Sequence, residues 1–133
     1  MALPDYEPAL DRLDEIIQLD DGWDGEGSLK PTVRTFASVH SLLQCACLAC
    51  VNRPMLSVSS TGAISLHWKN GKTLMVVMVF GFVYSAHAYE AGAIVFSSRW
   101  ELGDRSGIYK NFLTYMKEHF KFQGEENGVD CKS

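Results

Sequence analysis

The stretch DDGWDGEGSLKP, residues 20–31, gathers four carboxylates and three glycines within twelve positions. Carboxylates at this spacing bind a cation or act as general acids and bases, and the alternative is a turn between two helices. Asp20, Asp24 and Gly25 match positions one, five and six of an EF-hand loop. Position three is a glycine, however, and position twelve is Pro31 in place of the bidentate glutamate. The stretch therefore does not match a calcium loop.

A structural turn gives each special residue of this stretch a role. We expect Gly22 and Gly25 to adopt positive φ, which glycine does without steric cost. Asp24 or Ser28 is expected to cap the helix that follows. Trp23 is expected to anchor the loop in the hydrophobic core.

Two histidines, His67 and His87, are secondary candidates for a site. If Asn70–Gly71 and Phe80–Gly81 form two-residue turns, both histidines flank Leu74 on one sheet face. They are then two strands apart, about 10 Å at the usual strand spacing, too far to share a small metal ion. No sequence motif of a hydrolase, a nucleotide-binding loop or a zinc protease is present. We assign no catalytic residue, no metal ligand and no cofactor.

The three cysteines of a C-x-C-x-x-C pattern fall within the second predicted helix. The spacing of Cys45, Cys47 and Cys50 suggests a zinc or iron–sulfur site. At about 100° per residue, however, Cys45 and Cys47 point to nearly opposite sides of a helix. We expect buried structural thiols.

Hydrophobic periodicity predicts an α+β fold with two N-terminal helices, a five-stranded antiparallel meander and a C-terminal helix packed on the sheet. The first helix lies within residues 5–23 and buries Leu10, Leu13, Ile16 and Ile17. The second opens after Ser28 and runs to about Val51, with a buried stripe of Phe36, Val39 or His40, Leu43, Cys47 and Cys50. Strands are expected at 55–60, 63–69, 73–80, 82–89 and 93–98, and the last helix at 105–122. Its stripe is Ile108, Phe112, Tyr115, Met116 and Phe120.

One domain is expected over residues 1–122, followed by a flexible tail at 123–133. The Asn70–Gly71 pair is the best turn signal, and it predicts that Lys69 pairs with Lys72.

Charge is distributed unevenly along the chain. The net charge is −4, which makes direct nucleic-acid binding an unlikely function. Residues 1–29 contain nine acidic side chains and one basic side chain, so this segment carries −8 and the rest of the chain +4. Such an asymmetry attracts a basic protein partner, unless lysines and arginines of the same protein compensate it. The candidate partner-binding residues are Asp11, Asp14, Glu15, Asp20, Asp21, Asp24 and Glu26.

The setting expected for the chain is cytoplasmic. No apolar stretch reaches the roughly 18 residues of a membrane span, and the first residues lack the pattern of a secretion signal. A homodimer is a further expectation, through an edge strand (55–60 or 93–98) or through the cysteine-rich helix.

The motifs GWDGEGS and P-x-L-S-V-S-S-T-G-A-I-S-L-H-W resemble those of small uncharacterised proteins from bacteria, phages and their mobile elements. The resemblance covers about residues 10–80, and its matching positions are Trp23, Asp24, Gly25, Gly62 and Trp68. His67 stands where the family's pattern has a glutamate. The resemblance implies a fold and a mobile-element origin, and no activity.

We therefore predict a non-catalytic protein-binding protein, an anti-CRISPR-like inhibitor of a host defence complex that acts through its acidic surface. The alternatives are an antitoxin-like partner, and a small metal- or ligand-dependent enzyme that uses the loop 20–26 and a histidine.

Overall fold

Two helices precede five strands and one helix follows them in the computed structural model, which describes residues 3–122. This order confirms the α+β class predicted from periodicity. The predicted tail at 123–133 lies outside the described residues. The elements are α1 (Glu7–Ile17), α2 (Val33–Leu48), β1 (Met55–Val58), β2 (Ile64–Asn70), β3 (Thr73–Phe80), β4 (Val83–Glu90), β5 (Ala93–Glu101) and α3 (Ile108–His119).

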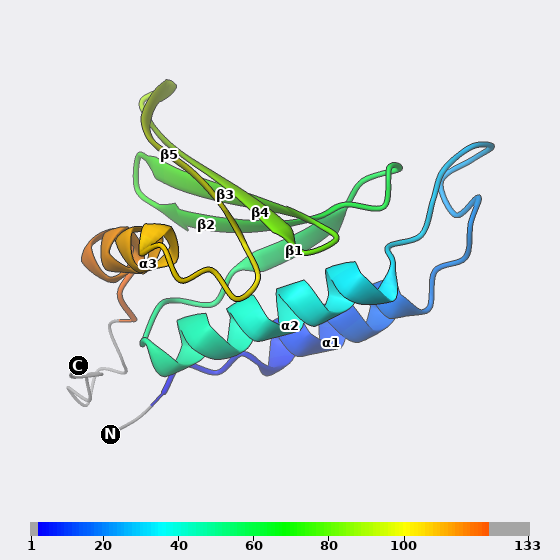
Figure 1. The fold of residues 1–133 in the computed structure, drawn as a ribbon, viewed down its shortest axis with the longest axis horizontal. Coiled ribbons are helices and arrows are strands. Elements are labelled where there is room, and N and C mark those ends of the chain that lie inside the picture. Colours follow the sequence, from blue (N-terminus) through cyan, green and yellow to red (C-terminus); the bar gives the residue numbers. More distant parts are fainter. Residues whose placement is uncertain (1–2, 123–133) are drawn as a thin grey trace.

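The strands form one antiparallel sheet in the order β1-β2-β3-β4-β5, as the predicted meander requires. All three helices lie on the same side of this sheet, α1 against β1, α2 against β3 and α3 against β5 (Figure 1). Successive side chains of β3 point to opposite faces of the sheet, and those on the helix-covered face, Met75, Val77 and Val79, are buried. The opposite face of the sheet carries no helix among the described residues.

Both central hairpins are shifted by two residues from the predicted register. Asn70 pairs with Thr73, and Phe80 pairs with Val83, so the turns are Gly71–Lys72 and Gly81–Phe82. Gly71 adopts φ +60° at the first central position, where a type II′ turn requires glycine. The side-chain amide of Asn70 donates to the His119 carbonyl at 2.8 Å, which holds Asn70 in the strand. Because side chains alternate with a period of two, the shift leaves every residue on its predicted face.

The core lies between the sheet and the three helices. Trp68 of β2, Phe112 of α3 and Ile16 of α1 are fully buried in it. The Tyr6 hydroxyl donates to the carbonyls of Val51 and Asn52, each at 2.8 Å, and thereby ties the start of α1 to the end of α2.

Helices α2 and α3 differ from the prediction at both ends, and α2 ends at Leu48, three residues before the predicted Val51. Helix α2 begins at Val33, because the Thr32 hydroxyl caps it by accepting from the Thr35 backbone N–H at 3.3 Å. Neither Asp24 nor Ser28 caps this helix, so that prediction is wrong. Helix α3 begins at Ile108, three residues later than predicted, and ends at His119. The segment before it is a turn in which the Asp104 carboxylate accepts from the backbone N–H groups of Ser106 and Tyr109.

The predicted buried faces of the helices are correct in part. Leu13, Ile16, Val39, Leu43, Phe112, Met116 and Phe120 are buried as expected. Ile17 is 54% exposed and Ile108 is 39% exposed, which contradicts the prediction for both. His40 is exposed, because Ala46 and Leu42 complete the buried face of α2 in place of His40 and Cys47. Cys50 is buried but lies beyond the helix end.

Candidate partner-binding surface

The seven predicted partner-binding carboxylates lie on α1 and on the loop between α1 and α2. We call these residues the acidic surface: Asp11, Asp14, Glu15, Asp20, Asp21, Asp24 and Glu26. Every one of them is exposed. The loop, residues 18–32, projects beyond the ends of both helices (Figure 1), so its carboxylates extend the charge of α1 outward.

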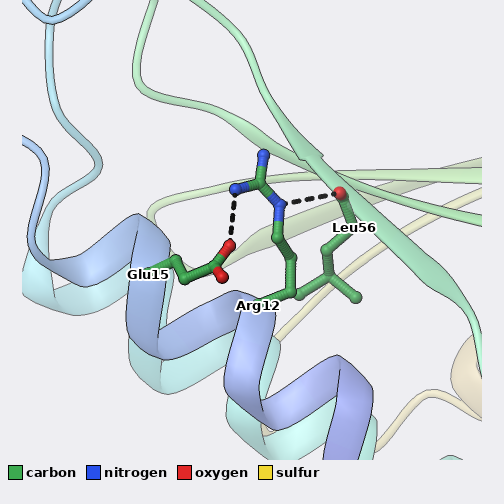
Figure 2. Close-up of polar contacts among 3 residues, drawn as sticks. All are labelled: Arg12, Glu15 and Leu56. Atoms are coloured by element: carbon green, nitrogen blue, oxygen red, sulfur yellow. Dashed lines mark hydrogen bonds and ion pairs between the residues drawn. The ribbon is translucent and has the colours of Figure 1, made fainter.

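Compensation of this charge by the protein itself is slight. Among the described residues, the acidic surface has one ion pair, between Arg12 and Glu15 at 3.1 Å. The same guanidinium donates through Nε to the Leu56 carbonyl of β1 at 3.5 Å, as Figure 2 shows. Helix α1 has no basic residue in its last turn, where a cation would offset the helix dipole. The alternative of an internally compensated acidic face is therefore poorly supported.

The loop is held in one conformation by its own backbone. Gly22 and Gly25 adopt φ +87° and +103°, as predicted for this turn. The Gly22 N–H donates to the Ser28 carbonyl at 2.8 Å and the Gly25 N–H donates to the Gly22 carbonyl at 3.1 Å. Such internal bonding means that the loop loses little conformational entropy when it binds.

Two side chains of the loop brace it further. The buried Ser28 hydroxyl accepts from the Asp24 N–H at 2.9 Å and donates to the Gly25 carbonyl at 2.7 Å. One oxygen of Asp21 accepts from the Lys30 N–H at 3.1 Å. Within the described chain, the carboxylates of Asp20, Asp24 and Glu26 accept no hydrogen bond. These three carboxylates are thus free to contact a partner.

Trp23 does not anchor the loop in the core, which corrects the prediction. Its side chain is half-buried and lies outside the core cluster. The indole N–H donates to the Leu29 carbonyl at 2.8 Å and so closes the loop on itself. Part of the indole is therefore presented to solvent beside the loop carboxylates, next to Leu29, which is 51% exposed.

The loop is attached to the turn between β1 and β2. The Leu29 N–H donates to the Ser60 carbonyl at 2.7 Å. Gly62 has φ +89°, and a Cβ at this position would lie 3.0 Å from the Lys30 carbonyl oxygen. A glycine is therefore needed where the turn meets the loop.

The two histidines are placed as the sequence predicts, with one neighbour changed. His67 and His87 both pair with Val76 in place of Leu74, on the sheet face that carries no helix. His67 Nε2 lies 3.2 Å from the Ser57 hydroxyl, and His87 Nδ1 lies 2.9 Å from the Ser97 hydroxyl. The structure brings neither histidine to the acidic loop.

The cysteines do not converge. Cys45 and Cys47 are free, half-buried thiols on α2. Burial raises the pKa of the Cys47 thiol, and the nearby Asp5 carboxylate adds to this effect. Within residues 3–122, no group of three or more histidine, cysteine, aspartate or glutamate side chains is arranged to hold a metal ion.

One feature that sequence reasoning missed is a cavity of about 280 Å³ between α2, the end of β5 and the start of α3. Tyr84, Trp100 and Tyr109 provide aromatic walls, with Cys45 and Asp104 nearby. The rings of Tyr84 and Trp100 are stacked, with their centroids 5.1 Å apart. Burial raises the pKa of the Tyr109 hydroxyl. These aromatic residues come from separate elements, so no local spacing in the sequence marks the cavity.

Comparisons with known proteins give no match: no protein-family model, no curated protein and no solved structure is similar to the chain. No helix within the described residues has the length and apolar character needed to cross a membrane.

Proposed function

We propose that this chain is a non-catalytic protein-binding protein whose acidic surface contacts a basic surface of its partner. The observation that carries the proposal is the exposure of seven carboxylates with one ion pair among them in the described chain. Clustered charge of one sign raises the rate of encounter with an oppositely charged partner and disfavours partners of the wrong charge.

The loop supplies the features of a binding anchor. Its internal hydrogen bonds fix its shape before binding, which lowers the entropic cost of association. Trp23 and Leu29 present apolar surface beside the carboxylates. Tryptophan is among the residues that contribute most to binding energy when a partner covers it.

The biological setting we propose is inhibition of a host defence complex by a phage- or mobile-element-encoded protein, in the manner of anti-CRISPR proteins. Its support is the resemblance of the GWDG loop and of the hairpin motif to mobile-element proteins. An antitoxin-like role would use the same surface. The identity of the captured partner distinguishes these two roles, because the inhibitor role predicts a defence nuclease complex and the antitoxin role predicts a toxin.

The enzyme alternative has less support. It requires a histidine near the loop 20–26, whereas the hydrogen bonds of His67 and His87 go to Ser57 and Ser97 on the sheet. If it were correct, Asp24→Ala would abolish a metal-dependent activity in a folded protein.

The proposal is tested by capture of partners from bacterial lysate with the tagged full chain, at low and at moderate salt, followed by mass spectrometry. We expect a stoichiometric partner that is retained at low salt and released as salt screens the contact. A partner retained equally at both salt concentrations, or no partner at all, would contradict binding through the acidic surface.

A further inference from the structure

The face of the sheet opposite the helices, which no helix covers in Figure 1, carries apolar side chains along its central strand. Leu74, Val76, Met78 and Phe80 of β3 all lie on this face, in alternation with the buried residues of the same strand. Met78 is 47% exposed and Phe80 is 57% exposed. We call this surface, formed by all five strands, the open sheet face.

The neighbouring strands extend the apolar stripe. Met55 of β1 is 78% exposed and Ile94 of β5 is 61% exposed. Val83 and Tyr89 of β4 lie between β3 and β5 on the same face and are half-buried. Ser65, His67, Ser85 and His87 flank Val76 and Met78, so the apolar side chains of this face lie along β3 and beside its two ends on β4 and β5. Exposed apolar surface of this kind marks an interaction site.

The charge of the open sheet face differs from that of the acidic surface. Its charged side chains, Lys69, Arg99 and Glu101, lie on β2 and β5, and none lies on β3. The face is therefore apolar along its middle and nearly neutral in total, so two copies of it can approach each other without strong repulsion.

We propose that the open sheet face is the interface of a homodimer, in which the sheets of two copies pack face to face. The sheet has five strands, and at about 4.8 Å between strands and about 3.4 Å per residue its face measures roughly 20 by 25 Å. Contact over this face removes on the order of 1,000 Å² of accessible surface from the two copies together, which is the lower bound of specific interfaces. Two sheets in contact pack with their strands nearly aligned.

The strand registers make the face self-complementary. A two-fold axis parallel to β3, between the two sheets, places β3 opposite itself, β2 opposite β4 and β1 opposite β5. Met78 then faces Met78 of the second copy, because every residue of β3 keeps its position along the axis. Lys69 faces Tyr89, since both pair with Leu74, and Arg99 faces Ser57, since both lie in the row of Met78. This arrangement opposes no two lysine, arginine, aspartate or glutamate side chains of like charge, and it places His67 opposite His87, since both pair with Val76.

The sheet edges are poorer candidates for the dimer than the sequence suggested. Strand β1 has four residues, which is short for an intermolecular ladder. Strand β5 contains a bulge opposite Ala88 and Tyr89 and carries Arg99 and Glu101 near its end. Bulges and charges of this kind protect an edge from pairing.

The dimer is tested by sedimentation equilibrium of the full chain over a wide range of concentration, with Met78→Glu as the interface variant. The account predicts a dimer for the wild type and at least a tenfold increase in the dimer dissociation constant for Met78→Glu, because two glutamates then face each other without water. Thr114→Glu, an exposed position on α3, is the matched control and leaves the dimer unchanged. Circular dichroism verifies that both variants are folded.

Chemical crosslinking across the axis gives a second, independent measurement. Because facing sheets pack about 10 Å apart, the two thiols of Met78→Cys are too far apart for a disulfide but within reach of a short bifunctional maleimide. Met78→Cys should therefore form a crosslinked dimer with this reagent, whereas Met55→Cys, which faces Ser97 of the second copy, should not crosslink beyond the wild-type background. A monomer at all concentrations, an unaffected dimer in Met78→Glu, or crosslinking through Met55→Cys alone would overturn the proposal. None of these outcomes bears on partner capture by the acidic surface, which lies on other elements.

Discussion

At the scale of single residues, the effect of replacing Trp23 shows whether the loop serves only the fold or also binds a partner. A fully buried tryptophan contributes several kcal/mol to stability, whereas Trp23 is half-buried and closes the loop with one hydrogen bond. Its exposed part lies beside Leu29 and the loop carboxylates. We therefore expect this side chain to have a modest effect on folding and, if the loop binds a partner as proposed, a large effect on binding.

We predict that Trp23→Ala lowers the free energy of unfolding by roughly 1 to 2 kcal/mol, for one hydrogen bond and partial burial. The same variant should weaken binding to the captured partner at least tenfold. Denaturant unfolding and calorimetric titration measure the two effects. Trp23→Phe, which keeps a ring but removes the N–H, should recover most of the binding. A stability loss of 3 kcal/mol or more with unchanged binding would show a purely structural residue.

Tyr84 gives the fold a dependence on alkaline pH. Burial raises the pKa of its hydroxyl from 10.0 to about 12, and the hydroxyl donates to the Ser38 carbonyl at 2.6 Å. The folded state thus favours the protonated phenol, because the charged form would be buried. This contribution to stability is fully present below pH 10 and is lost as the pH rises from 10 to about 12.

The expected result for Tyr84→Phe is a lower free energy of unfolding at pH 8, by about 1 kcal/mol, because the Ser38 carbonyl loses its donor. The advantage of the wild type should shrink as the pH rises above 10 and reverse before pH 12, because only the wild type has a buried phenol that must ionise and the shift to about 12 exceeds the hydrogen-bond contribution. Urea unfolding at several pH values between 8 and 11.5 measures the difference. A difference that stays constant over this range would contradict the burial of the phenol.

At the scale of elements, the attachment of the acidic loop to the β1–β2 turn sets the position of the binding surface. Gly62 and Gly71 both have positive φ, so an alanine is strained at either site. A Cβ at Gly62 would also lie 3.0 Å from the Lys30 carbonyl oxygen, whereas a Cβ at Gly71 would have no neighbour within 4 Å. An alanine would thus be strained at both sites, at φ +89° for Gly62 and +60° for Gly71, and only at Gly62 would it also make a close contact.

Gly62→Ala should therefore destabilise the protein more than Gly71→Ala, whose cost is on the order of 1 kcal/mol. It should also weaken partner binding, because the backbone clash displaces the loop from Ser60. Thermal unfolding of both variants, with partner binding as the second readout, makes the comparison. Equal destabilisation of the two variants, with equal binding, would mean that the close approach at Gly62 has no effect.

The elements themselves follow from the sequence to a large extent, and their boundaries less so. Periodicity predicts three helices and five strands because apolar spacing reports which face is buried. The turn lies at Gly71–Lys72, one residue later than predicted, and the pairing is shifted by two, because the Asn70 amide bonds to His119, a contact across the fold that local turn preferences do not contain. The start of α2 was misplaced because Ser28, a good cap by type, is used inside the loop.

The candidate site is predictable in composition and not in geometry. The carboxylates between Asp11 and Glu26 are evident from the sequence, and their exposure follows from their charge. The half-exposed position of Trp23 is not evident, since its type alone favours burial. Its placement depends on the Leu29 carbonyl and on the glycine turns around it.

At the scale of the whole molecule, the two proposed surfaces lie on different elements and are compatible. Helix α1 lies on the helical side of the sheet, the acidic loop projects beyond the ends of α1 and α2 beside the β1–β2 turn, and the open sheet face is the side without helices (Figure 1). A face-to-face dimer would leave both acidic surfaces accessible. Two linked copies of one binding surface raise the apparent affinity for a partner that presents two sites.

The most direct measurement of the central claim compares two triple variants that remove equal charge. Asp20→Asn, Asp24→Asn and Glu26→Gln neutralise three carboxylates of the loop, and Glu7→Gln, Glu90→Gln and Glu118→Gln neutralise exposed acids outside both proposed surfaces. Titration of the captured partner at low salt is the readout. We predict at least a tenfold loss of affinity for the loop variant and little change for the other. Equal losses of affinity in the two variants would show that binding depends only on the net charge of the protein. An unchanged affinity of the loop variant would contradict binding through the acidic surface.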